Sequence, residues 1–381
     1  MENRPRSLEN LELMIFMNAF QGAYRGKRVL VTGHTGFKGS WLCEWLLGLG
    51  AEVAGYSVDV PSNPSHFEIL KLSERLTHRM GDVRNAASLT QFIQEFKPEI
   101  VFHLAAQALV RKSYDHPADT FETNLMGTVR VLDAIRSVTS VKAAVFITSD
   151  KCYENVEWEY GYRETDRLGG QDPYSASKAC AEIAFSSYAR SFFASPDSAR
   201  IASARAGNVI GGGDWAVDRI VPDCVRAWSA GKDVSIRNPS STRPWQHVLE
   251  PLSGYLMLGA ALLKSKEEVR NESFNFGPPA DVTQSVDQLI REVQKTWKNA
   301  NWKQEGPAPS AKKEAGLLKL NCDKAWHRLS WEPTLKFEES IRMTAEWYLA
   351  AQKDPALAAE ITRTQIGEYA RFATERKRAW V

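Results

Sequence analysis

Cysteine is scarce in this 381-residue chain, and its five cysteines are scattered without a CxxC pair. This pattern argues against a disulfide framework and against a zinc site, so no metal is expected. Apolar runs of the roughly 20 residues that a membrane span needs are also missing. The N-terminal residues lack the pattern of a cleavable signal peptide. Together these absences favour a cytoplasmic protein with reduced thiols.

An excess of one charge is missing as well, because 48 basic residues stand against 46 acidic ones and the net charge is +2. That balance gives no general reason to expect binding of nucleic acid or of a membrane surface. Any recognition of phosphate must therefore be local. The composition, 43% hydrophobic and 25% charged, is that of a globular protein that can bury a sizeable core.

What the chain does have is an alternation of short apolar runs and helical patterns. The apolar runs that predict buried strands lie at 27–33, 52–58, 99–105, 142–148 and 201–205. The patterns with helical periodicity lie at 40–49, 87–96, 123–137 and 175–193. Such alternation predicts an α/β protein whose parallel sheet is covered on both faces, a Rossmann-type doubly wound fold.

Three regions are expected along the chain. Residues 1–26 are interpreted as an N-terminal extension, because the first continuous apolar strand begins at Lys27. Residues 27–207 are expected to form the dinucleotide-binding domain. After Gly207 the chain becomes rich in glycine, proline and tryptophan, so residues 208–381 are expected to form mainly a smaller, mixed substrate-binding lobe that interleaves with the first domain.

A glycine-rich turn joins the first predicted strand to the first predicted helix. Its glycines allow a tight turn and a close approach of a pyrophosphate to backbone N–H groups, and the helix dipole favours negative charge there. The residues of this turn expected to hold a dinucleotide are Gly33, Thr35, Gly36, Phe37, Lys38 and Gly39. Asp59 follows the second strand, where a carboxylate binds ribose hydroxyls and disfavours a 2′-phosphate, so NAD is predicted. Asp82 and Val83, after a further strand-like stretch, are expected to border the adenine.

Tyr174 and Lys178 begin the helix predicted over 175–193 and lie four residues apart, so they share one face of it. A lysine cation beside a phenol favours the phenolate and lowers the pKa of the tyrosine. The pair is therefore expected to act in proton transfer near neutral pH.

The glycine turn and the YxxxK pair together resemble the extended short-chain dehydrogenase/reductase family, from Lys27 to about Trp347. The resemblance implies an NAD-dependent enzyme that oxidises a sugar hydroxyl, and cofactor contacts of Tyr174 and Lys178. Further positions that match the cofactor side of that family are Leu104, Ala105, Ala106, Gln107 and Asn124.

Ser149, Asp150 and Lys151 follow the strand predicted over 142–148, where active sites of open sheets lie. Sugar 4,6-dehydratases of the family usually carry Thr-Asp-Glu there, and the Ser-Asp-Lys version resembles their CDP-sugar branch. The implied reaction on CDP-glucose starts with oxidation at C4, for which Tyr174 takes the proton while Ser149 holds the oxygen. Water is then eliminated across C5 and C6 with Asp150 as the acid, and hydride returns to C6.

Lys151 stands where relatives use a glutamate as the base at C5. A lysine can do this only when it is neutral, and it could instead stabilise the enolate as a cation, so both interpretations stay open. On the substrate side, Asn208, Arg219 and Arg243 are expected to bind the sugar or the diphosphate. The resemblance also implies a homodimer or homotetramer. Alternatives are a dehydratase or 4-epimerase of another nucleotide sugar and a non-catalytic NAD-sensing protein.

Overall fold

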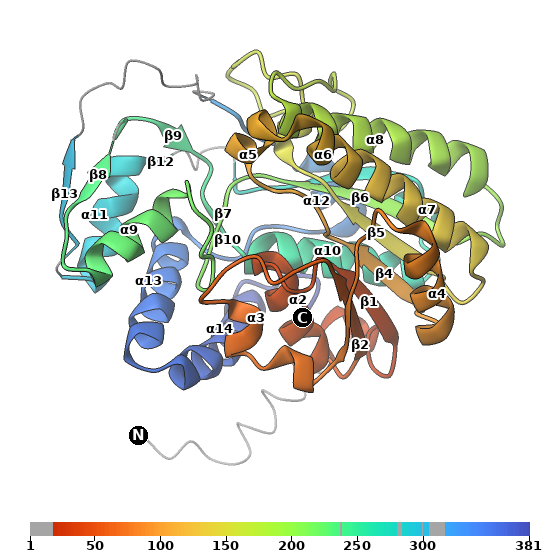
Figure 1. The fold of residues 1–381 in the computed structure, drawn as a ribbon, viewed down its shortest axis with the longest axis horizontal. Coiled ribbons are helices and arrows are strands. Elements are labelled where there is room, and N and C mark those ends of the chain that lie inside the picture. The colour runs from red at the N-terminus through yellow and green to blue at the C-terminus, as the bar shows by residue number, and fades with distance from the viewer. Residues whose placement is uncertain (1–17, 237, 280–283, 299, 305–316) are drawn as a thin grey trace.

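A seven-stranded parallel sheet with helices on both faces forms the centre of the molecule (Figure 1). The computed structural model describes residues 18–236, 238–279, 284–298, 300–304 and 317–381. Across the sheet the strands are β11 (Ser273–Phe276), β6 (Arg200–Ala206), β5 (Ala143–Ile147), β4 (Ile100–His103), β1 (Arg28–Thr32), β2 (Glu52–Ser57) and β3 (Thr77–Met80). This confirms the predicted Rossmann-type fold.

The strands read as continuous apolar runs because both faces of the sheet are covered. Successive side chains of β1 alternate between two hydrophobic clusters: Val29 and Val31 belong to one, and Leu30 to the other. The helices packed in the cluster of Leu30 are α4 (Ala86–Phe96), α7 (Gly127–Ser137) and α8 (Pro173–Phe192). Those in the opposite cluster include α2 (Phe37–Gly48), α10 (Leu249–Leu263), α13 (Phe337–Lys353) and α14 (Pro355–Glu375).

The order of the strands fixes where a ligand can bind. From β1 the chain builds β2 and β3 outward on one side, and it then returns to place β4 on the other side of β1. In open parallel sheets the crevice at such a reversal, outside the carboxyl ends of the strands, is the usual ligand site. A ligand site is therefore expected among the residues that follow β1, β4 and β5.

Residues beyond 207 contribute both to the sheet and to a smaller lobe. Strand β11 pairs with β6 at the edge of the sheet, while the elements on the left of Figure 1 form the lobe. The lobe includes α9 (Ile220–Ser229), β8 (Val234–Ile236), β9 (Thr242–Arg243), β12 (Gln284–Ser285), α11 (Val286–Thr296) and β13 (Trp302–Gln304). The division of the chain at residue 207 stays a prediction.

Several short elements connect these layers. They are α3 (His66–Ile69), α5 (Val110–Asp115), α6 (Pro117–Phe121), the π-helix η3 (Glu122–Met126), the 3₁₀ turn η4 (Asp150–Cys152), β7 (Val209–Ile210), β10 (Gln246–His247) and α12 (Asp323–Leu329). Within the described residues, no helix combines the length and apolar character that crossing a membrane requires.

Part of the expected N-terminal extension packs into the core. The 3₁₀ turn η1 (Ala19–Gly22) precedes the first strand, and the Phe20 and Tyr24 side chains are buried in the core. Phe20 stacks on Trp380 with ring centroids 5.1 Å apart, and the Tyr24 hydroxyl donates to the Leu256 carbonyl at 2.5 Å. These partners lie far along the chain, so local patterning does not reveal them. Residues 1–17 of the expected extension lie outside the described residues.

Candidate active site

The glycine turn between β1 and α2 is shaped by close backbone contacts. Gly33 has φ +74°, and a Cβ there would lie 2.7 Å from the backbone nitrogen of Ala105. A Cβ on Gly39 would lie 2.1 Å from the carbonyl oxygen of Gly33, so α2 passes directly over the turn. Helix α2 begins at Phe37, earlier than predicted, and has no side-chain cap. Its first N–H groups are therefore suited to bind the phosphates of a dinucleotide.

Of the predicted ribose and adenine residues, Asp59 contacts this turn. Asp59 is exposed two residues beyond β2, and its main-chain carbonyl accepts a hydrogen bond from Thr35 Oγ1 at 2.6 Å. Asp82 follows β3, and its two carboxylate oxygens accept from the backbone N–H and Nε of Arg84, each at 2.8 Å. The Val83 side chain is buried in the core against α7.

The loop after β4 is anchored by a residue of the π-helix η3. Asn124 accepts from the Gln107 backbone N–H at 2.8 Å and donates to the Gln107 carbonyl at 3.1 Å. The same amide donates to Ser177 Oγ on α8 at 2.9 Å. Leu104, Ala105 and Ala106 precede this anchor and are partly exposed. A π-helical turn often marks a functional site, and here it connects the predicted cofactor loop to the helix of Tyr174.

Residues 149–151, which we call the catalytic turn after their predicted role, directly follow β5 and Thr148. Ser149 Oγ donates to Asp150 Oδ1 at 2.9 Å and accepts from the Lys151 backbone N–H at 3.3 Å. Asp150 is only 3% exposed. Burial raises the pKa of its carboxyl above the usual range, although the Lys151 ammonium and the Ser149 hydrogen bond lower it. Asp150 is thus favoured as a proton donor.

Tyr174 lies in the first turn of α8, close to the catalytic turn. Asp172 caps this helix by accepting from the Ser175 N–H at 3.0 Å, and Pro173 starts it. Burial raises the pKa of Tyr174 to about 12, whereas a hydrogen bond with Ser149 lowers it. The expectation of a phenol with a lowered pKa is therefore wrong for the protein alone, because desolvation outweighs the Ser149 hydrogen bond and the positive charge of Arg219.

Two lysines approach the same cluster from different helices. Burial lowers the pKa of Lys178 to about 8, while the negative charge of Glu182 raises it. Burial also lowers the pKa of Lys38 to about 8, with Arg219 lowering it further and Asp150 raising it. Lys38, predicted only as a cofactor residue, therefore lies within electrostatic reach of the catalytic turn.

The predicted substrate residues come from the segments that follow β6. Asn208 is partly exposed between β6 and β7, and its carbonyl accepts from the Gln246 N–H at 3.3 Å. Arg219 pairs with Asp214 at 2.8 Å, and its positive charge acts on Tyr174, so it belongs to the same electrostatic cluster. Arg243 lies on β9, where its Nη1 donates to the Thr242 carbonyl at 2.8 Å.

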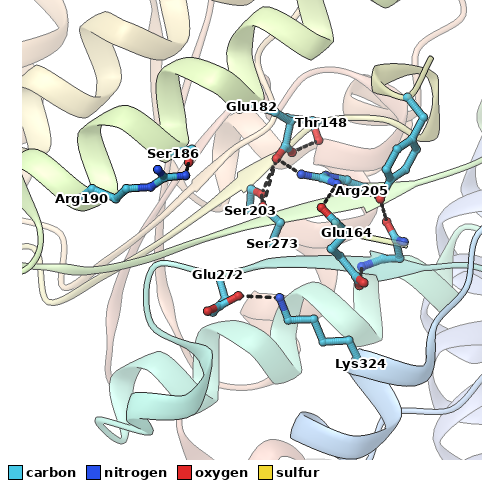
Figure 2. A network of polar contacts seen from close by, with 12 residues as sticks. Thr148, Glu164, Glu182, Ser186, Arg190, Ser203, Arg205, Glu272, Ser273 and Lys324 are labelled. Atoms are coloured by element: carbon cyan, nitrogen blue, oxygen red, sulfur yellow. Dashed lines mark hydrogen bonds and ion pairs between the residues drawn. The ribbon is translucent and has the colours of Figure 1, made fainter. Parts of the chain in front are cut away.

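A buried ion pair beneath the site was missed by sequence reasoning. Glu182 of α8 and Arg205 of β6 are 1% and 4% exposed and lie 2.6 Å apart (Figure 2). The signals were present, since Glu182 stands four residues after Lys178 and Arg205 interrupts a buried strand. A charged residue in a buried strand requires a partner, but the sequence does not show which one.

Comparisons with known proteins agree with this geometry. A family model described as GDP-mannose 4,6 dehydratase matches residues 30–344. A CDP-glucose 4,6-dehydratase of Salmonella typhimurium is 48% identical over 332 residues, which are 86% of this chain and 92% of that protein.

Solved structures share the fold. A dTDP-glucose 4,6-dehydratase of Streptomyces venezuelae with NAD bound has a TM-score of 0.72 at 21% identity, over 86% of this chain and 99% of that one. A UDP-glucose 4-epimerase of Thermus thermophilus in complex with NAD has a TM-score of 0.71 at 26% identity, over 85% and 99% of the two chains.

Proposed function

The chain belongs to the GDP-mannose 4,6-dehydratase family, and from this membership we propose that it converts CDP-glucose into CDP-4-dehydro-6-deoxyglucose with NAD as a regenerated cofactor. The observation that carries the proposal is Asp150, a buried acid in the same cluster as Tyr174. An epimerase needs only to oxidise and reduce C4, whereas loss of water from C5 and C6 also needs a proton donor. The 48% identity to a CDP-glucose 4,6-dehydratase supports the choice of nucleotide.

NAD fits the turn between β1 and α2. The close contacts at Gly33 and Gly39 leave no room for side chains, and the uncapped start of α2 offers N–H groups to the pyrophosphate. Asp59 is proposed to bind the adenosine ribose, and the segment 104–107 with Asn124 is proposed to contact the cofactor. When bound, NAD would accept the hydride of C4 and later return it to C6.

The residues around the catalytic turn then have separate roles in the proton transfers. Tyr174 takes the proton of the 4-hydroxyl, with Ser149 as its hydrogen-bond partner. The ketone at C4 acidifies the hydrogen on C5, and Asp150 gives a proton to the departing 6-hydroxyl. Lys178 supplies a positive charge beside the phenol, and Lys151 acts at C5 as base or as cation. Arg219 is proposed to bind the diphosphate together with Asn208 and Arg243.

Incubation of the purified protein with CDP-glucose and NAD tests the proposal. We expect a product lighter by one water, carrying a ketone at C4 and deuterium at C5 when the reaction runs in heavy water. UDP-, GDP- and dTDP-glucose serve as matched controls for the nucleotide. A product that is the 4-epimer, without loss of water, would instead favour the epimerase. Absence of turnover with every nucleotide-glucose would favour an NAD-sensing protein.

Replacement of Lys151 separates its two possible roles. We expect Lys151→Ala to slow turnover by about 100-fold, the lower range for loss of an acid–base group. Lys151→Arg keeps the positive charge but provides no neutral amine base. If the arginine variant is as slow as the alanine variant and incorporates little deuterium at C5, Lys151 is the base. If Lys151→Arg recovers turnover, the role of Lys151 is to stabilise the enolate with its positive charge.

A further inference from the structure

The Glu182 carboxylate gathers four hydrogen bonds in the buried region beneath the active site (Figure 2). It accepts from Thr148 Oγ1 at 2.5 Å, Arg205 Nη2 at 2.6 Å, Ser203 Oγ at 2.9 Å and Ser273 Oγ at 3.1 Å. Burial opposes its ionisation, yet the Arg205 guanidinium and these bonds hold the pKa of Glu182 below its usual range. A full negative charge is therefore fixed inside the protein.

The second terminal nitrogen of the Arg205 guanidinium binds a residue just beyond the catalytic turn. Arg205 Nη1 binds Tyr153 Oη at 2.8 Å, and that hydroxyl donates to Asn275 Oδ1 at 2.8 Å. Thr148 directly precedes the catalytic turn, and Tyr153 follows it after one intervening residue. The ion pair therefore holds residues 149–151 from both sides, through one hydroxyl bound to Glu182 and one bound to Arg205.

Stability alone is a weak explanation for this arrangement. Apolar residues of similar volume often replace a buried ion pair without loss of stability, since removing two charges from water is costly. Apolar residues cannot, however, bind the hydroxyls of Thr148 and Tyr153. They also cannot place a negative charge one helical turn beyond Lys178.

We propose that the Glu182–Arg205 pair is a positioning device for the reaction, which holds the catalytic turn against Tyr174 and places a negative charge one helical turn from Lys178. The proposal rests on the proposed function, because it assigns the pair a role in coupling oxidation at C4 to loss of water. Neither residue is expected to touch the substrate. Both act through the residues that they hold.

The charge part of this role depends on the titratable groups around Lys178. Besides Tyr174, they include Glu182 on its own helix, Cys152 at the end of η4, His103 at the end of β4 and Lys38 on α2. Burial raises the pKa of the Cys152 thiol and lowers the pKa of His103 to about 3, so both are neutral near pH 7. Within this set, Glu182 therefore supplies the negative charge that favours the Lys178 ammonium.

Tyr153→Phe tests the hold on the turn, since it removes one hydroxyl and leaves the ion pair in place. A hydrogen bond to a charged group corresponds to roughly tenfold in rate, so we expect about a tenfold fall in kcat with little change in KM. Elimination should slow more than oxidation, and reduced nicotinamide should accumulate during a single turnover. The matched control is Tyr369→Phe, which removes a buried hydroxyl bonded to Glu250 at 2.9 Å outside the site. Its kcat should be unchanged.

Glu182→Gln and Glu182→Asp test the charge. Loss of the carboxylate lowers the pKa of Lys178 further, so the alkaline limb of kcat should move down by about one pH unit in the glutamine variant. Glu182→Asp should restore the alkaline limb to its wild-type position, because aspartate keeps the negative charge. If the glutamine variant does not fold, Tyr153→Phe still tests whether the pair holds the catalytic turn.

Two results would overturn the proposal: a Tyr153→Phe protein with wild-type kcat and no accumulation of reduced cofactor, or identical pH profiles for Glu182→Gln and wild type. An inactive wild type has a different meaning. It would contradict the proposed function itself, and the positioning role would be lost with it.

Discussion

Tyr174→Phe should lower turnover of CDP-glucose by about 1000-fold, within the range for loss of a general base. Phenylalanine fills the same space in the first turn of α8, so NAD affinity should change little. The reaction cannot start without removal of the 4-hydroxyl proton, and Tyr174 is the phenol that interacts with Ser149. No reduced nicotinamide should therefore form in a single turnover, in contrast to variants that block only the later steps.

The pH dependence provides a second measurement on the same residue. Burial raises the pKa of Tyr174 to about 12 in the protein alone. The positive charge of oxidised nicotinamide should lower that pKa when the cofactor binds. The rate of C4 oxidation should rise with pH as the phenol loses its proton, and this limb should be missing from the phenylalanine variant. Tyr188→Phe, on the same helix, is the control. A Tyr174→Phe enzyme within about tenfold of wild type would contradict the role.

Much of the fold could be predicted because its signals are local. The strand β5 is a run of five apolar residues that are all buried, and such runs arise where both faces of a sheet are covered. The glycine turn was equally readable, since the contacts of Gly33 and Gly39 exclude side chains. By contrast, the core position of Phe20 depends on Trp380, more than 300 residues away, and no local pattern encodes that contact.

The candidate site, like the fold, could be predicted only where its signals are local. Sequence spacing placed Tyr174 and Lys178 on one helical face, and the structure adds Glu182 one turn further on. The direction of the pKa shift of Tyr174 could not be predicted, because it depends on how deeply the folded protein buries the phenol. The partners of Glu182 come from β6, from β11 and from the residue after β5, so their convergence appears only in the folded sheet.

Asp150→Asn should separate oxidation from loss of water. The amide keeps the size of the side chain but has no acidic proton for the departing 6-hydroxyl, so elimination should slow by about 1000-fold. Because Tyr174 is untouched, C4 oxidation should continue, and reduced nicotinamide should accumulate together with an unreleased 4-keto sugar. Rapid quenching of a single turnover, with the cofactor followed by absorbance, measures both. Asp166→Asn, in the loop before α8, makes the same chemical change outside the cluster and should leave both steps at wild-type rates.

The rate of water elimination should depend on pH with the opposite sign to the rate of C4 oxidation. Burial raises the pKa of Asp150, so the carboxyl keeps its proton to higher pH than an exposed aspartate. Elimination needs that proton, and its rate should fall as pH rises through the pKa of Asp150. Oxidation at C4 rises with pH, so turnover as a whole should show a bell-shaped profile. In the asparagine variant the fall that follows Asp150 should disappear from the rate of elimination, whereas the limb that follows Lys178 should stay. If Asp150→Asn eliminates water at the wild-type rate, the acid lies elsewhere. The buried carboxyl would then no longer distinguish this site from that of an epimerase.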